Sequence, residues 1–119
     1  RELCPPDFVL LSGDDALTLP VLAIGGTGVI SVAANIVPRD CAALIEAFNK
    51  GDLAKAQGLH RKLSVLVRAL FIETNPIPVK TAMHMMKLCD GTLRLPMCEM
   101  EETNLAKLRQ ALVNYGLIK

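Results

Sequence analysis

The sequence predicts a mainly helical α/β fold, in which two short parallel strands joined by a helix are followed by four more helices. Two uncharged apolar segments, residues 8–11 and 28–33, have the length and composition of buried strands. A helix-length segment separates them, and a crossover of this kind joins parallel strands. From residue 38 onward, apolar residues recur three and four positions apart, as on one face of a helix.

The helix between the two strands is predicted from signals at both of its ends. Asp14 and Asp15 precede its first turn, where negative charge is stabilised by the helix dipole. Pro20 falls early enough in the segment to be tolerated. Gly25 or Gly26 is expected to end the helix in the left-handed conformation, before the second strand.

Four amphipathic segments follow the second strand. The first spans residues 38–51, and the second spans residues 52–73 with a continuous apolar seam. The seam consists of Ala56, Leu59, Leu63, Leu66 and Leu70. The third is expected to begin with Asn75 as its N-cap and to end at Gly91. The fourth spans residues 102–116 and stops at a glycine.

Composition excludes several classes of function. The 119 residues have a net charge of +1, and aromatic residues make up only 3%. A basic surface and stacking aromatic residues are therefore missing, so no nucleic-acid partner is expected. The four cysteines form no C-x-x-C pair, which excludes the usual spacing of a zinc site and favours reduced thiols in a cytoplasmic protein.

The uncharged stretch between Asp15 and Arg39 allows three interpretations. Its length would permit a membrane span, but a proline and several glycines argue against one. The "GGTG" motif lies after a helix and before a strand, whereas phosphate loops lie before a helix. The favoured interpretation is a helix end followed by a tight turn. Ligand contacts are then expected at the carboxyl ends of the strands, at "SGDD" and "VAAN".

Several motifs, in one order and spacing, resemble the C-terminal part of the dihydrodipicolinate synthase family. They are "FVLLSGDD", "GGTGVISVAANIVPRD", "NPIPVK" and "TLRLPM". The pair "NPIPVK" and "LRLPM" is specific, whereas "GDD" or "GGTG" alone would be weak. The resemblance covers essentially the whole chain, and the wider family includes N-acetylneuraminate lyase and related pyruvate-dependent aldolases.

The resemblance implies a (β/α)8 barrel followed by a helical extension. Residues 1–50 would supply the last two β/α units, and residues 51–119 the extension. The implied reaction joins pyruvate, held as a lysine Schiff base, to L-aspartate semialdehyde, on the route to diaminopimelate and lysine. Ile30 is implied to contact the pyruvate-derived group. The residues implied near the semialdehyde are Gly13, Asp14, Asp15 and Asn75.

By the same resemblance, the Schiff-base lysine lies upstream of Arg1, so no catalytic residue is expected within this chain. No cofactor is implied beyond the covalent pyruvate imine. Lys80 lies near a site motif, but the family does not use this lysine for the imine, and a structural role is favoured. Asp14 and Asp15 lack a third oxygen ligand in sequence, so no metal is expected.

The implied partners are pyruvate, the semialdehyde and the missing N-terminal portion of the barrel. The full protein is expected to be a homotetramer in the cytoplasm, without membrane contact. Two parallel strands cannot close a barrel, so the chain alone is not expected to fold as a stable monomer.

Two alternatives remain open on the sequence. One is a related pyruvate aldolase such as N-acetylneuraminate lyase. The other is a non-catalytic helical interaction module, whose apolar seams would bind partner helices. Met83, Met85 and Met86 cluster on one helix and could contact a partner, but helical core is the favoured interpretation. A buried βαβ unit that carries "SGDD" argues against such a module, because an interaction module has little use for one.

Overall fold

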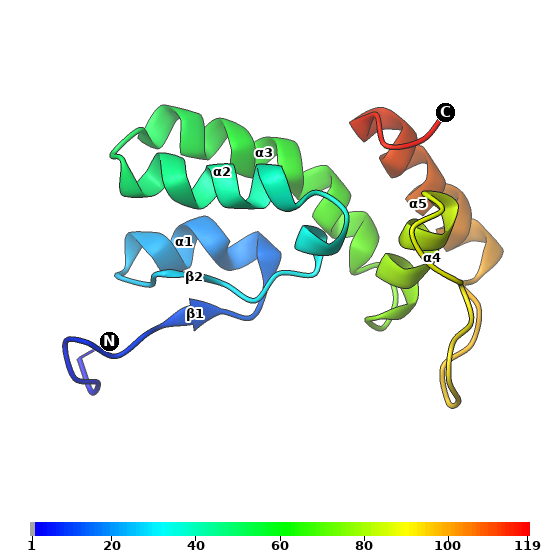
Figure 1. The fold of residues 1–119 in the computed structure, drawn as a ribbon, viewed down its shortest axis with the longest axis horizontal. Coiled ribbons are helices and arrows are strands. Elements are labelled where there is room, and N and C mark those ends of the chain that lie inside the picture. The colour runs from blue at the N-terminus through cyan, green and yellow to red at the C-terminus, as the bar shows by residue number, and fades with distance from the viewer. Residues whose placement is uncertain (1) are drawn as a thin grey trace. The chain divides into compact units, whose positions relative to one another are not determined.

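The computed structural model describes residues 2–119, and these form two compact units (Figure 1). The first unit extends to Leu63 and the second runs from Ser64 to Lys119. The boundary falls within helix α3, Leu53–Leu70. Arg1, the first residue of the expected barrel portion, lies outside the described residues.

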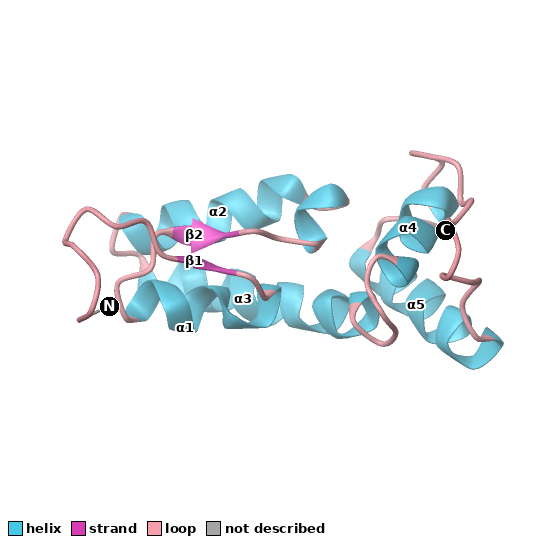
Figure 2. Cartoon of the chain, turned by 90° about the horizontal axis from the view of Figure 1, so that it is seen from below, coloured by secondary structure: helices cyan, strands magenta, loops and turns pink. Residues whose placement is uncertain are grey.

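A two-stranded parallel sheet lies in the first unit (Figure 2), which confirms the predicted pairing. Strand β1 is Leu11–Ser12 and strand β2 is Gly28–Val29. Leu11 pairs with Gly28, and Ser12 pairs with Val29. Two flanking hydrogen bonds extend the ladder: Thr27 N donates to Leu10 O and Ile30 N donates to Ser12 O, both at 2.8 Å.

The predicted strands at 8–11 and 28–33 were too long, and their burial was overestimated. Phe8 and Val9 lie outside β1 and are 51% and 62% exposed. The second predicted strand stops after Val29 because the chain turns into a short 3-10 helix, η2 (Ala33–Asn35). The backbone N–H groups of Val32 and Ala33 fix this turn by donating to the side chain of Asp15, which follows β1.

The connection between the strands is helical, as predicted. It consists of a 3-10 turn, η1 (Asp15–Leu17), that continues into helix α1 (Thr18–Ala23). Pro20 falls inside the first turn of α1, where a missing N–H costs nothing. Gly25 adopts a positive φ of 92°, which is the predicted left-handed helix end.

Helix α2 (Pro38–Asn49) packs against α1 and η2. It begins with a proline and ends before Gly51, which has a φ of 77°. Lys62 Nζ on α3 donates to Asp40 Oδ2 on α2 at 2.6 Å. Six apolar side chains from these elements form the core of the unit: Leu22, Ala33, Leu44, Ala47, Ala56 and Leu63.

The second unit contains the end of α3, helix α4 (Ile77–Met85) and helix α5 (Glu102–Tyr115), which packs on α4. Its buried residues include Leu66, Leu70, Val79, Ala82, Leu108 and Leu112. Glu73 Oε1 accepts from Glu101 N at 3.1 Å and Asn104 Nδ2 at 3.0 Å. A carboxylate from another segment thus caps the start of α5, which has no side-chain cap of its own.

Two predicted boundaries of α4 were wrong. Asn75 is not its N-cap: Pro76 holds that position, and the Asn75–Pro76 peptide bond is cis. Gly91 is not its stop, because the helix ends at Met85 and Lys87 adopts the left-handed conformation at φ 60°. Leu88 N donates to Met83 O, and Lys87 N donates to His84 O, both at 2.9 Å. Lys87 therefore occupies the left-handed position at the helix end that is usually a glycine.

The segment after α4 is irregular up to Met100. Within residues 2–119, no helix is both long enough and apolar enough to cross a bilayer.

Candidate functional site

The loop after β1 is organised by short-range hydrogen bonds. Ser12 Oγ donates to Asp14 O at 2.7 Å and accepts from Asp14 N at 3.1 Å. Asp14 Oδ1 accepts from Ala16 N at 2.7 Å, so Asp14 is the N-cap of η1. Gly13 is exposed and Asp14 is half-buried, and no atom lies within 4 Å of the position a β-carbon would take at Gly13. The loop therefore presents open surface at the carboxyl end of β1.

Asp15 is buried, whereas Asp14 beside it in sequence is half-buried. The exposed fraction of Asp15 is 8%. Oδ2 accepts from Val32 N at 2.8 Å and from Ala33 N at 3.3 Å, while Oδ1 accepts from Ser31 Oγ. The carboxylate therefore joins the loop after β1 to the loop after β2.

Ile30 follows β2 directly, and its side chain is 69% exposed. Its backbone N–H is held by Ser12 O, which fixes Ile30 beside the loop that carries Gly13 and Asp14. Four of the five predicted site residues, Gly13, Asp14, Asp15 and Ile30, thus gather at one edge of the sheet. This is the edge at which parallel α/β proteins bind ligands.

Asn75 belongs to the second unit, where it is exposed and directly precedes Pro76 and α4. Its role in a site therefore remains a prediction.

Sequence reasoning missed two residues behind this edge, Ser31 and Cys41. Ser31 Oγ accepts from Ala34 N at 2.8 Å and lies 3.7 Å from Cys41 Sγ. Burial raises the pKa of the Cys41 thiol, the Ser31 hydrogen bond opposes this, and the negative charges of Asp15 and Asp40 add to the rise. The available signal was a hydroxyl inside an uncharged, apolar stretch, since such a group needs a partner once buried.

Lys80 has a structural contact in the second unit. Its Nζ donates to the carbonyl oxygen of Thr92 and so holds the irregular segment against α4. This contact agrees with the structural role favoured by the sequence.

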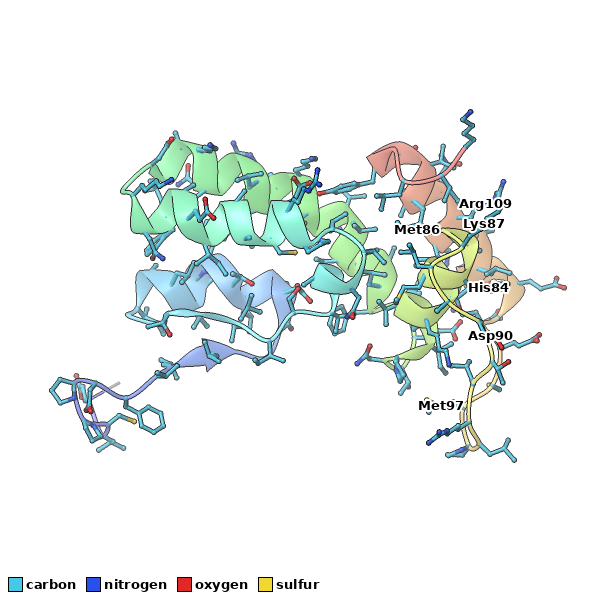
Figure 3. The ribbon with its side chains drawn as sticks, viewed as in Figure 1. His84, Met86, Lys87, Asp90, Met97 and Arg109 are labelled. Carbon is cyan, nitrogen blue, oxygen red and sulfur yellow. The ribbon has the colours of Figure 1, made fainter. Side chains whose placement is uncertain are left out.

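A cavity of about 650 Å³ lies beside this contact, in the second unit. Its lining includes Thr81, His84, Met85, Asp90, Met97 and Leu105. Figure 3 shows His84 on α4, with Asp90 and Met97 on the irregular segment that follows. Thr92 N and Oγ1 each donate to Asp90 Oδ1 at 3.0 Å, and these bonds lower the pKa of the exposed Asp90 carboxyl.

No metal centre is indicated in the part of the chain that the structure describes, where no three His, Cys, Asp or Glu side chains are grouped to hold an ion.

The fold defines an α/β protein with a parallel sheet, and the candidate site lies at the carboxyl ends of its strands. The chain belongs to the dihydrodipicolinate synthetase family, whose model matches residues 1–115. It is 58% identical over 114 residues to a 4-hydroxy-tetrahydrodipicolinate synthase of Endomicrobium trichonymphae, covering 96% of this chain and 39% of the relative. A synthase of Thermodesulfovibrio yellowstonii is 54% identical over 118 residues, covering 99% of this chain and 40% of that relative.

Solved structures agree with these relatives. The dihydrodipicolinate synthase of Aquifex aeolicus superimposes with a TM-score of 0.95 at 49% identity, over 98% of this chain and 40% of that structure. The synthase of Methylacidiphilum fumariolicum SolV gives a TM-score of 0.95 at 48% identity, over 97% of this chain and 38% of that structure. This chain thus spans about 40% of the length of the relatives that it matches.

Proposed function

We propose that this chain forms the C-terminal part of an enzyme that condenses pyruvate with L-aspartate semialdehyde, the step that opens diaminopimelate and lysine biosynthesis. The family match and the names of the relatives support this reaction. The observation that carries it is the grouping of Gly13, Asp14 and Ile30 at the carboxyl ends of β1 and β2. In this proposal β1 and β2 are the last two strands of a (β/α)8 barrel.

The chemistry of each side chain fits a distinct part of the reaction. Ile30 offers an exposed apolar surface for the methyl or methylene carbon of a pyruvate imine. Gly13 leaves space beside it. The capping bond of Asp14 uses Oδ1 and not Oδ2, so the charge of this carboxylate suits the ammonium group of aspartate semialdehyde.

The imine itself is assigned to a lysine outside these 119 residues. In such chemistry the imine stabilises the carbanion of pyruvate, so the proposed reaction needs no metal and no other cofactor. We therefore expect the 119-residue chain by itself to be inactive. Its natural partner is the remaining portion of the barrel, which would cover the exposed apolar residues Phe8, Val9 and Leu11. The full enzyme is proposed to be a homotetramer.

A chimera tests the proposal. This chain would replace the matching C-terminal 40% of the Aquifex aeolicus synthase, to which it is 49% identical. The chimera would be incubated with pyruvate and borohydride and its intact mass recorded. Its turnover would then be measured with aspartate semialdehyde. The controls are the unaltered Aquifex enzyme and a chimera carrying Ile30→Asp, which places a charge against the pyruvate-derived group.

We expect one reduced pyruvate adduct per subunit, turnover with aspartate semialdehyde, and loss of turnover in the Ile30→Asp chimera. A folded chimera that forms the adduct but cleaves N-acetylneuraminate instead would transfer the assignment to the related lyase. A folded chimera that binds pyruvate and turns over neither substrate would refute the proposal. An adduct on the isolated 119-residue chain would move the imine to a lysine of this chain, and Lys80 would be examined first.

A further inference from the structure

Both oxygens of the Asp15 carboxylate accept hydrogen bonds from its own chain. Three donors converge on its two oxygens: the Ser31 hydroxyl, Val32 N and Ala33 N. The carboxylate is buried, whereas Asp14 beside it is half-buried and Gly13 is exposed. A side chain with its acceptors occupied in this way has little capacity left to bind a substrate.

The donors lie directly after Ile30 in sequence. The backbone of Ile30 is itself tied to β1 through its N–H and Ser12 O. Strand β2 ends at Val29. In the described sheet, the bond from Ile30 N to Ser12 O is therefore the one ladder bond that Ile30 makes. The next backbone N–H groups along the chain are held by Asp15 rather than by a strand.

We propose that Asp15 is a positioning residue that fixes Ile30 through Ser31, Val32 and Ala33, and that it does not itself bind the semialdehyde. This inference rests on the proposed function, because it assigns Asp15 to the pyruvate side of the same site. The two adjacent carboxylates then have different roles. Asp14 lies at the ligand edge, while Asp15 holds the backbone segment that directly follows Ile30.

The geometry requires a carboxylate and not an amide. Both oxygens of Asp15 accept, and every partner is a donor. In Asp15→Asn, one acceptor becomes an NH2 group that faces either the backbone N–H groups or the Ser31 hydroxyl. One set of donors then loses its partner in a buried position, which is unfavourable. Ser31→Ala removes one donor to Asp15 and the acceptor of Ala34 N, but it leaves both backbone donors to Asp15 in place and is the milder change for the carboxylate.

The test uses the active chimera with three substitutions: Asp15→Asn, Ser31→Ala and, as a matched control, Asp14→Asn. The control removes the same charge one residue away and keeps the capping oxygen of Asp14. Three quantities are measured: pyruvate adduct formation with borohydride in the absence of semialdehyde, KM for each substrate, and hydrogen exchange of the Val32 and Ala33 amides.

We expect Asp15→Asn to lower the apparent affinity for pyruvate about tenfold or more, and to speed exchange at Val32 and Ala33. Ser31→Ala should do the same to a smaller extent. A variant with both Asp15→Asn and Ser31→Ala should lose less pyruvate affinity than the sum of the two single losses, since the two residues act as one unit. Asp14→Asn should raise KM for the semialdehyde and leave pyruvate adduct formation unchanged.

Normal adduct formation in Asp15→Asn together with a raised KM for the semialdehyde would overturn the inference and make Asp15 a substrate ligand. Should Asp15→Asn not fold, Ser31→Ala carries the test, and unchanged pyruvate affinity with unchanged amide exchange would refute the inference. A parent chimera that forms no adduct at all would instead refute the proposed function, and the amide exchange would still report on the Asp15 contacts.

Discussion

Gly26 lies so close to Val21 that a β-carbon at Gly26 would come within 2.7 Å of the Val21 carbonyl oxygen. The cause is the closing turn of α1, in which Gly26 N donates to that oxygen at 2.8 Å and Gly25 N donates to Leu22 O at 3.1 Å. This turn sends the chain directly into β2, and so it determines where β2 pairs with β1.

Replacing Gly26 with alanine should therefore destabilise the first unit. The added methyl group would meet a backbone oxygen that cannot move without breaking the helix end, and the cost of such overpacking is about 1–3 kcal/mol. We expect the thermal unfolding midpoint of the chimera to fall. An unchanged midpoint would show that the turn relaxes without cost.

Gly58 should respond to the same substitution with the opposite sign. It lies inside α3, and no atom is within 4 Å of its β-carbon position. Alanine is favoured over glycine in a helix interior by about 1 kcal/mol. We expect Gly58→Ala to raise the midpoint, which makes it the matched control for Gly26→Ala. A lower midpoint would mean that another part of the protein occupies this space.

Lys87 is the one non-glycine residue with a positive φ among residues 2–119. It closes α4 with the bonds normally made around a glycine. An L residue pays about 1–2 kcal/mol for this conformation, and part of that is offset because glycine is more flexible in the unfolded chain. We expect Lys87→Gly to raise the midpoint slightly, and Lys87→Ala to leave it near the parent value. A destabilised Lys87→Gly variant would show that the lysine side chain makes a compensating contact.

Cys41 should be the slowest thiol to react with iodoacetamide, and Cys98 among the fastest. Cys41 is buried and its pKa is raised, mainly by burial, whereas Cys98 is exposed. The reactive species is the thiolate, so a raised pKa lowers the reactive fraction at neutral pH. Peptide mapping after brief alkylation at pH 8 checks this order. Early modification of Cys41 in folded protein would contradict it.

The same thiol gives a pH dependence of stability. With its pKa raised on folding, Cys41 stabilises the folded state below the ordinary thiol pKa of about 8.5, and this contribution is lost as pH rises through the folded value. The unfolding midpoint should therefore fall more steeply above pH 8.5 in the parent than in Cys41→Ala. Equal slopes in the two proteins would show that the thiol does not titrate differently on folding.

Much of the architecture was predictable because its signals are local. The carboxylates before α1, the glycines after it and the periodic apolar faces of α2, α3 and α5 each act within about one helical turn. The meeting of the loops after β1 and β2 was predictable for a related reason, since parallel strands end at one edge. Ile30 was predicted to lie inside the second strand, and its place in the site was implied only by the family resemblance.

The ends of α4 were not predictable from such signals. Asn75 is a residue type favoured at N-caps, and Gly91 is one favoured at helix ends. Pro76 is nevertheless the N-cap of α4, and Lys87 adopts the left-handed conformation after it. Packing can place an ordinary residue in a costly conformation when the surrounding contacts compensate, and propensity alone then gives the wrong boundary.

By itself, the sequence determined the order of the elements, the parallel pairing of the strands and the place of Asp14 and Asp15 before the first helix. Only the tertiary structure separated Asp15 from Asp14 and joined it to Ser31. These two residues are sixteen positions apart, and their bond forms because the βαβ crossover returns the chain to the same edge. Identical neighbouring carboxylates look alike in sequence, whereas burial and the direction of the nearest donors decide what each one does.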